Sequence, residues 1–221
     1  NSTKKFINTG FTIQANSGER HKIEKPKSPS LNTIVYAPKW RCDELKCTEL
    51  PYDILKTVYN QTLLYVVDAD ELDVANQVSS DDLAVVSVCN FKDLKGKIPN
   101  VSSLGQTEAI HAQTSIRETF KKVSRSGKDE EYMCAYAPST AIIRDGLSNG
   151  FAFYTDPKHV DIVGVSNKES NEGDETYEFT LLKLRAKIDE ALRVCAHNEK
   201  RTVVLPLFGY RSLKSDDGAV S

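Results

Sequence analysis

Runs of consecutive apolar residues alternate along the chain with segments whose apolar positions recur every three or four residues. Three of the runs have almost no polar positions and predict strands that are covered on both faces: residues 63–67, 83–89 and 160–165. We expect the run 83–89 at the centre of the sheet because it contains the fewest polar atoms. Shorter β-rich runs predict further strands at 11–15, 31–36, 132–136, 140–143, 151–154 and 202–208.

Four segments carry apolar residues at helical spacing and predict helices at 43–50, 70–78, 106–123 and 177–196. Because buried strands alternate with amphipathic helices, the sequence predicts a three-layer α/β/α domain with helices on both faces of the sheet. Residues 1–30 are mostly polar and contain Pro26 and Pro29. We therefore expect an N-terminal extension, 1–30, packed on a core domain that comprises residues 31–221.

Composition and charge narrow the class of protein. The chain has 29 basic and 31 acidic residues, well mixed, and a formal net charge of -2, so no broad positive field is available for nucleic acid or an anionic membrane. No apolar run approaches the ~18 residues of a membrane span. We expect a soluble protein with neither nucleic acid nor membrane as a partner. The five cysteines are an odd number, and three lie in apolar stretches, which favours free thiols and an intracellular location, cytoplasmic or nuclear.

Candidate chemistry lies in the loops that follow the predicted strands, because ligands of such sheets bind beyond the carboxyl ends of the strands. Three loops qualify: 90–105, 166–173 and 209–218. The first leads into a helix whose opening turn contains Gln106, Thr107 and Glu108. A helix N-terminus favours an anion, which makes Glu108 a candidate beside a phosphate. Acidic residues are also common in the first turn of any helix, so Glu108 has an ordinary structural explanation as well.

Other motifs carry less information. His111 follows Glu108 by three residues, but a Glu-x-x-His pair binds metal when a second such pair faces it, and the sequence has none. Cys42 and Cys47 likewise lack a second ligand pair. Residues 146–150, Gly-Leu-Ser-Asn-Gly, match the G-x-S-x-G pattern of serine hydrolases, but a β-like segment follows where that motif needs a helix. We interpret this segment as a turn between two strands, and we expect no metal ion and no cofactor.

Six segments in order match the pattern of one family. The first three are residues 10–14 together with Asn-Thr-Ile-Val-Tyr-Ala-Pro at 32–38, the central strand that ends in Asn-Phe at 90–91, and Gln-Thr-Glu at 106–108. The fourth is Tyr-Ala-Pro-Ser at 136–139 together with Ile-Arg-Asp-Gly at 143–146. The last two are Val-Asp-Ile-Val at 160–163 together with Ser-Asn at 166–167, and the segment from Val-Val-Leu to Phe-Gly at 203–209. Over nearly its whole length the chain thus resembles the microbial-type poly(ADP-ribose) glycohydrolases, which are macrodomain-like. The resemblance implies a macrodomain-like domain with a mixed central sheet, and a cleft for ADP-ribose.

The resemblance also implies site residues. The family's acid, which protonates the leaving oxygen of the glycosidic bond, corresponds to Glu108. The implied ligand contacts are Asn90, Phe91, Asp93, Asn100, Val101, Ser102, Gln106, Thr107, Ser166, Asn167, Phe208, Gly209, Tyr210 and Arg211. The implied partner is ADP-ribose or an ADP-ribosylated protein, and a further protein partner stays open. The family has an additional helix after its last strand, which is consistent with a truncated C-terminus here.

The chain departs from the family where phosphates are held. The family has three glycines where this chain has residues 99–102, Pro-Asn-Val-Ser, so side chains reshape or block the approach of a diphosphate to the backbone. Thr107 replaces the first signature glutamate, and Tyr210 and Arg211 stand where Cys-Gly usually follow. Three interpretations stay open: a divergent hydrolase of ADP-ribosyl bonds, a binder of ADP-ribose or another nucleotide without turnover, and a scaffold for protein–protein contacts whose cleft is closed by side chains.

Overall fold

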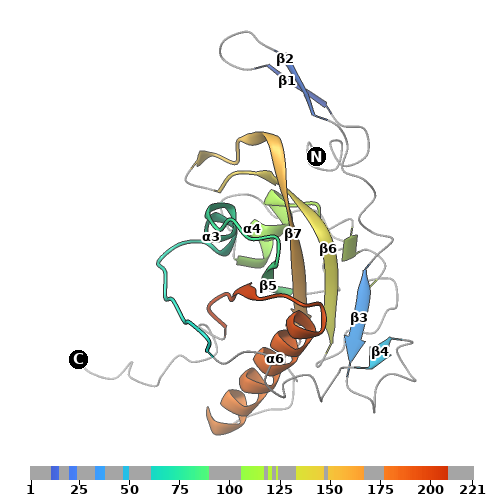
Figure 1. Ribbon diagram of the computed structural model, residues 1–221, viewed down its shortest axis with the longest axis vertical. Helices are drawn as coiled ribbons and strands as arrows, with labels where there is room; N and C mark the ends of the chain where they lie inside the picture. Colours follow the sequence, from blue (N-terminus) through green and yellow to red (C-terminus); the bar gives the residue numbers. More distant parts are fainter. Residues whose placement is uncertain are drawn as a thin grey trace, which may run out of the picture.

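The computed structural model describes residues 11–14, 20–23, 33–37, 47–49, 61–89, 106–116, 119–120, 123, 133–146, 149–166 and 177–208. In these ranges a six-stranded mixed sheet has the order β4-β3-β6-β7-β5-β8 (Figure 1). Its strands are β3 (Ile34–Ala37), β4 (Thr48–Glu49), β5 (Leu83–Cys89), β6 (Cys134–Arg144), β7 (Phe153–Ser166) and β8 (Thr202–Val204). Strands β1 (Phe11–Gln14) and β2 (Arg20–Ile23) form a separate antiparallel pair.

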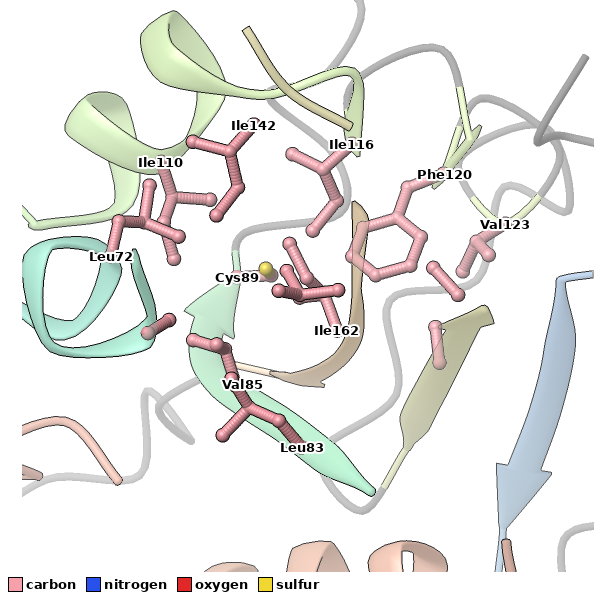
Figure 2. Close-up of a cluster of buried hydrophobic side chains, with 14 of the residues drawn as sticks. Leu72, Leu83, Val85, Cys89, Ile110, Ile116, Phe120, Val123, Ile142 and Ile162 are labelled. Atoms are coloured by element: carbon pink, nitrogen blue, oxygen red, sulfur yellow. The ribbon is translucent and has the colours of Figure 1, made fainter. Parts of the chain in front are cut away.

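Helices cover both faces of the six-stranded sheet. The described helices are α3 (Glu71–Gln77), α4 (Gln106–Gln113) and α6 (Tyr177–His197). Helices α3 and α4 contribute Leu72, Ala75 and Ile110 to a hydrophobic cluster on one face, drawn in Figure 2. Helix α6 contributes Ala191, Val194 and Cys195 to a second cluster on the other face. The predicted three-layer α/β/α fold is therefore confirmed.

Strand β5 joins the two clusters, because successive side chains of a strand point to opposite faces of the sheet. Leu83 and Val85 belong to the first cluster, and Ala84 and Val86 belong to the second. All four are at most 2% exposed, which confirms the prediction of a strand covered on both faces. The strand lies between β7 and β8, however, so the centre of the sheet is the β6–β7 pair rather than β5.

The β6–β7 pair is a long antiparallel hairpin where the sequence predicted four short strands. The two strands stay continuous because register shifts absorb the irregular positions, including Ser139, which has a φ of 53°. The turn contains Gly150, whose φ of 65° favours glycine, and Asp145 fixes it by accepting a hydrogen bond of 2.8 Å from the Gly146 amide. The interpretation of residues 146–150 as a turn between strands is confirmed, although Ser148 lies outside the described residues.

Other expectations about secondary structure were wrong. Residues 63–67 form no strand and are exposed, and residues 47–49 contain the short strand β4 instead of a helix. The helix predicted at 106–123 is interrupted: α4 ends at Gln113, Thr114 forms a β-bridge with Ile142, and the described residues 116, 119–120 and 123 are helical again. Strand β8 stops at Val204, two residues before Pro206, which cannot donate a ladder hydrogen bond.

Gly164 of β7 is required by its packing, and this generates a first prediction. A Cβ added there would lie 2.6 Å from Cε2 of Phe120, and this ring is fully buried. We expect Gly164→Ala to lower the free energy of unfolding by about 1–3 kcal/mol, measured by urea denaturation. In a Phe120→Leu background the same substitution should cost clearly less. An equal loss of stability in both backgrounds would show that a clash with the Phe120 ring is not the cause.

Candidate functional site

Three parallel strands run toward one edge of the sheet, and each is followed in the sequence by one of the predicted site loops. β5 is parallel to β7 and to β8, and the last residues of β5 and β7, Cys89 and Ser166, are paired. β8 is parallel to β5 and ends at Val204, opposite Val85. The described ends of β5 and β7 therefore lie together at the carboxyl edge, where the sequence predicted a ligand site.

The first turn of α4 lies close to this edge. Ile110 is 1% exposed and packs in the same cluster as Leu72 and Cys89, the last residue of β5 (Figure 2). Glu108 precedes Ile110 by two residues, which is about 3 Å of helix rise. The backbone of Gln106, Thr107 and Glu108 is thus held within one helical turn of the packing at the end of β5.

Hydrogen bonds to β6 fix the other end of α4. The Thr114 amide and the Thr114 hydroxyl both donate to the Ile110 carbonyl, at 3.0 and 2.7 Å, so the last turn of α4 is closed by two hydrogen bonds. The Ser115 amide donates to the Ala141 carbonyl at 3.0 Å, and the Ala141 amide donates to the Ser115 hydroxyl at 3.1 Å. Because these groups are buried, breaking any of them would leave an unsatisfied polar atom, so the orientation of α4 is well determined.

The structure places five of the predicted site residues. Gln106, Thr107 and Glu108 lie in the first turn of α4, Ser166 ends β7 and Phe208 follows β8. Ser166 is fully buried and its amide donates to the Met133 carbonyl at 3.0 Å, while Phe208 packs against the second cluster. The remaining predicted contacts lie outside the described residues: Asn90, Phe91, Asp93, Asn100, Val101, Ser102, Asn167, Gly209, Tyr210 and Arg211.

The thiol at the carboxyl edge is not set up for nucleophilic chemistry. Burial raises the pKa of Cys89 to about 12, although a contact of 3.7 Å with the Ser87 hydroxyl partly offsets this rise. Burial also raises the pKa of Cys195 to about 12 and that of Cys134 well above its usual value. Since the thiolate is the reactive form, all three thiols are inert at neutral pH. They are free cysteines, as the sequence predicted.

A small cavity lies at the opposite, amino end of β5. It has a volume of about 250 Å³, below the ~300–1,000 Å³ of most ligand pockets, and is lined by Ser79, Ser80, Asp81, Leu83, Lys158, His159, Val160 and Asp161. Its charged groups already stabilise the fold. Lys158 donates to the carbonyls of Ala75 and Val78 at the end of α3, at 2.7 and 2.6 Å. We therefore base the candidate site on the carboxyl edge of the sheet and not on this cavity.

Asp161, which lines the same cavity, belongs to a network that joins β6, β7 and the chain after α6. It accepts hydrogen bonds from the Tyr136 hydroxyl at 2.5 Å and the Ser139 amide at 2.8 Å, and it pairs with Lys200 at 2.5 Å. Burial, together with the bond to Asp161, raises the pKa of Tyr136. The network holds the irregular stretch of β6 in place, so its function is structural.

Neither a metal site nor a membrane span is evident in the parts of the chain that the structure describes. Within those ranges no three His, Cys, Asp or Glu side chains are grouped so that they could hold a metal ion. No described helix is long and apolar enough to cross a membrane.

The sequence analysis missed two buried acids, Glu71 of α3 and Glu190 of α6. Glu190 of α6 is 8% exposed, and its Oε2 atom has no hydrogen-bond partner. Burial, together with the neighbouring Asp189 carboxylate, raises the pKa of Glu190 to about 8, and nearby Lys187 and Arg193 only partly offset this. Glu190 precedes the buried Val194 by four residues, so helical spacing from the apolar stripe was the signal that could have located it.

The chain has a macrodomain-like three-layer α/β/α fold. Two similar solved structures are poly(ADP-ribose) glycohydrolases. The one from Thermomonospora curvata has a TM-score of 0.67 and 17% identity, covering 94% of this chain and 77% of that chain. The one from Deinococcus radiodurans, in complex with ADP-ribose, has a TM-score of 0.63 and 18% identity, covering 88% and 80%. No family model and no curated protein matches the chain. The likeness confirms the fold that the sequence resemblance implied.

The raised pKa of Glu190 predicts how stability depends on pH. The folded state keeps the Glu190 proton up to about pH 8, whereas the unfolded state loses it near the ordinary value of 4.5. Its contribution to the free energy of unfolding therefore falls as pH rises between these values. We expect Glu190→Gln to remove this loss, so that the variant gains stability relative to wild type from pH 5 to pH 8, by up to about 4 kcal/mol.

Urea denaturation at several pH values measures the difference in the free energy of unfolding between wild type and Glu190→Gln. Glu199→Gln, at an exposed position just after the same helix, is the matched control and should follow the wild-type curve at every pH. Wild-type and Glu190→Gln curves that stay parallel over this range would show that Glu190 titrates normally.

Proposed function

We propose that the protein binds ADP-ribose at the carboxyl edge of the sheet and hydrolyses ADP-ribosyl O-glycosidic linkages, with Glu108 as the general acid. The observation that carries this proposal is the position of the first turn of α4, which is held beside the end of β5. A solved structure with the same fold, from Deinococcus radiodurans, contains ADP-ribose. The match of Gln106, Thr107 and Glu108 to the family signature adds support from the sequence.

The proposed chemistry needs a protonated carboxyl group beside the scissile bond. Glu108 transfers its proton to the leaving glycosidic oxygen as the C–O bond breaks, and positive charge develops on the ribose as an oxocarbenium-like species. Water then adds to the anomeric carbon and returns a proton to the Glu108 carboxylate. A nearby diphosphate favours the protonated acid through like-charge repulsion, while the amide groups at the start of α4 favour the phosphate.

Departures from the family pattern in the sequence support a second candidate, a binder of ADP-ribose without turnover. The segment 99–102 has no glycine, and Thr107 has no carboxylate. Asn100, Val101, Tyr210 and Arg211 are then the side chains that shape the phosphate subsites, where Arg211 supplies a charged hydrogen-bond donor in place of backbone amides. A cleft closed by these side chains would instead favour a scaffold for protein–protein contacts.

We also propose that residues 31–221 form the macrodomain-like unit and residues 1–30 an extension of it. Supporting this division, β1 and β2 pair with each other and with no other described strand. The free buried thiols of Cys89, Cys134 and Cys195 support an intracellular location, because reducing compartments keep thiols unpaired.

Replacing the proposed acid tests the hydrolase directly. Glu108→Gln keeps the size of the side chain but cannot transfer a proton, so release of ADP-ribose from an ADP-ribosylated protein should fall by about 10²–10⁴-fold. The affinity for ADP-ribose, measured by calorimetry, should change little, because the substitution removes an interaction of the transition state.

Ser148→Ala is the control, since residues 146–150 form a turn and should not contribute to catalysis. Loss of turnover in this variant instead of Glu108→Gln would favour a serine hydrolase. Calorimetric binding with the same residual turnover in wild type and Glu108→Gln would leave the non-catalytic binder. No binding at millimolar ADP-ribose would eliminate both hydrolase and binder.

A further inference from the structure

The turn that joins β6 to β7 contains the only Asn-Gly pair in the sequence, Asn149 followed by Gly150. Both residues are exposed to solvent. An asparagine can lose its side-chain amide group when the backbone nitrogen of the next residue attacks the Cγ atom, and a following glycine has no Cβ atom to hinder this approach. Asparagine is accordingly among the thermolabile residues of proteins. The pair is therefore a candidate site of covalent modification.

The backbone of the turn leaves the attacking nitrogen available. The amides on either side of it, those of Asn149 and Phe151, both donate to the Gly146 carbonyl, at 3.1 and 3.2 Å. Within the described part of the chain, the Gly150 amide between them donates no hydrogen bond. A Cβ atom added to Gly150 would have no other atom within 4 Å, so its surroundings are open. Neither a hydrogen bond nor close packing therefore holds back this nitrogen.

We propose that Asn149 is a deamidation site, and that the carboxylate formed there weakens the attachment of the β6–β7 turn to α3. The Gly150 nitrogen forms a bond to Cγ of Asn149, its proton passes to solvent, and the side-chain nitrogen leaves as ammonia. Water then adds to one carbonyl of the cyclic imide and opens it to aspartate or isoaspartate. The net reaction consumes water and releases ammonia, so it needs no oxidant or cofactor.

The amide group that is lost has a defined role in the turn. Nδ2 of Asn149 donates to Oδ2 of Asp145 at 2.9 Å. Oδ1 of the same carboxylate accepts from the Gly146 amide at 2.8 Å and from the Tyr154 hydroxyl at 3.0 Å. The Tyr154 oxygen in turn accepts from Nδ2 of Asn76 in α3, also at 3.0 Å. One carboxylate thus connects the turn to a helix, and the Asn149 amide helps to orient it.

Deamidation replaces this donor with a further negative charge in an acidic region. A carboxylate at position 149 cannot donate to the Asp145 carboxylate, and at such a short distance the two charges repel. Asp73 of α3 lies beside the same turn, because a Cβ atom on Gly146 would be 3.3 Å from its Oδ1 atom. Burial, together with the Asp70 and Asp145 carboxylates, raises the pKa of Asp73. The added charge therefore opposes the contact between the turn and α3.

Peptide mapping by mass spectrometry tests the reaction after the purified protein has been incubated for several weeks in mildly alkaline buffer. The peptide that contains Asn149 should gain the mass difference between an amide and an acid, and an isoaspartate methyltransferase should label it increasingly with time. Asn198 is an internal control that should keep its amide, because Glu199 follows it and its Nδ2 donates to the Val194 carbonyl at 2.8 Å.

Asn149→Gln is the matched variant, since it keeps an amide group but cannot form the same five-membered ring. Its isoaspartate signal should stay at background. A wild-type signal no higher than that of Asn149→Gln would overturn the proposed site, as would an unchanged mass of the wild-type peptide.

Asn149→Asp measures the consequence for the turn without waiting for the reaction. The variant should lower the equilibrium constant of folding about tenfold in urea denaturation, as for a lost hydrogen bond to a charged group. Asn149→Ser removes the amide without adding charge and should cost less. Added salt should narrow the difference between the two variants, because it screens repulsion between exposed charges. An Asn149→Asp variant as stable as wild type would overturn the proposed effect on the turn.

Discussion

Parallel pairing between β5 and β7 is the interaction on which the rest of the structure depends. Six consecutive residue pairs, from Ala84 with Asp161 to Cys89 with Ser166, align the two strands. Alternate side chains of β5 enter opposite clusters, so one strand anchors both helical layers. Because Gly164 has no side chain, the Phe120 ring fits directly against β7. The same pairing makes the two strands end together, and this sets the location of the proposed site.

Placement of Glu108 thus follows from nonlocal packing rather than from the acid itself. Acidic residues favour the first turn of any helix, and that preference alone gives no function. What distinguishes Glu108 is that Ile110 ties its helix to the end of β5 while Ser115 ties the other end to Ala141 of β6. The acid role proposed for Glu108 requires a group held to within a fraction of an ångström, and attachment of α4 at both ends would supply that rigidity.

Elements with a local signal could be predicted from the sequence. The helix near 70–78 and the long helix from 177 carry apolar residues at helical spacing, and strand 83–89 is a continuous apolar run that is buried on both faces. The end of α4 could not be predicted, because it depends on a bridge between Thr114 and Ile142. The prediction of a buried strand at residues 63–67 failed for a different reason. Apolar character indicates that a segment favours burial, but it does not show that a neighbouring strand or helix is present. For the site, the sequence located the helical turn at 106–108, whereas the loop 90–105 has no periodicity from which to infer a conformation.

Strand β8 links the second hydrophobic cluster to the proposed site. The chain leaves this strand at Val204 and passes Leu205 and Leu207 before it reaches Phe208, a predicted ligand contact that packs on the second cluster. Helix α6 contributes Ala191, Val194 and Cys195 to the same cluster. The packing of α6 therefore helps to hold the backbone at the last described residue before the predicted phosphate loop, so the layer opposite α4 also contributes to the proposed site.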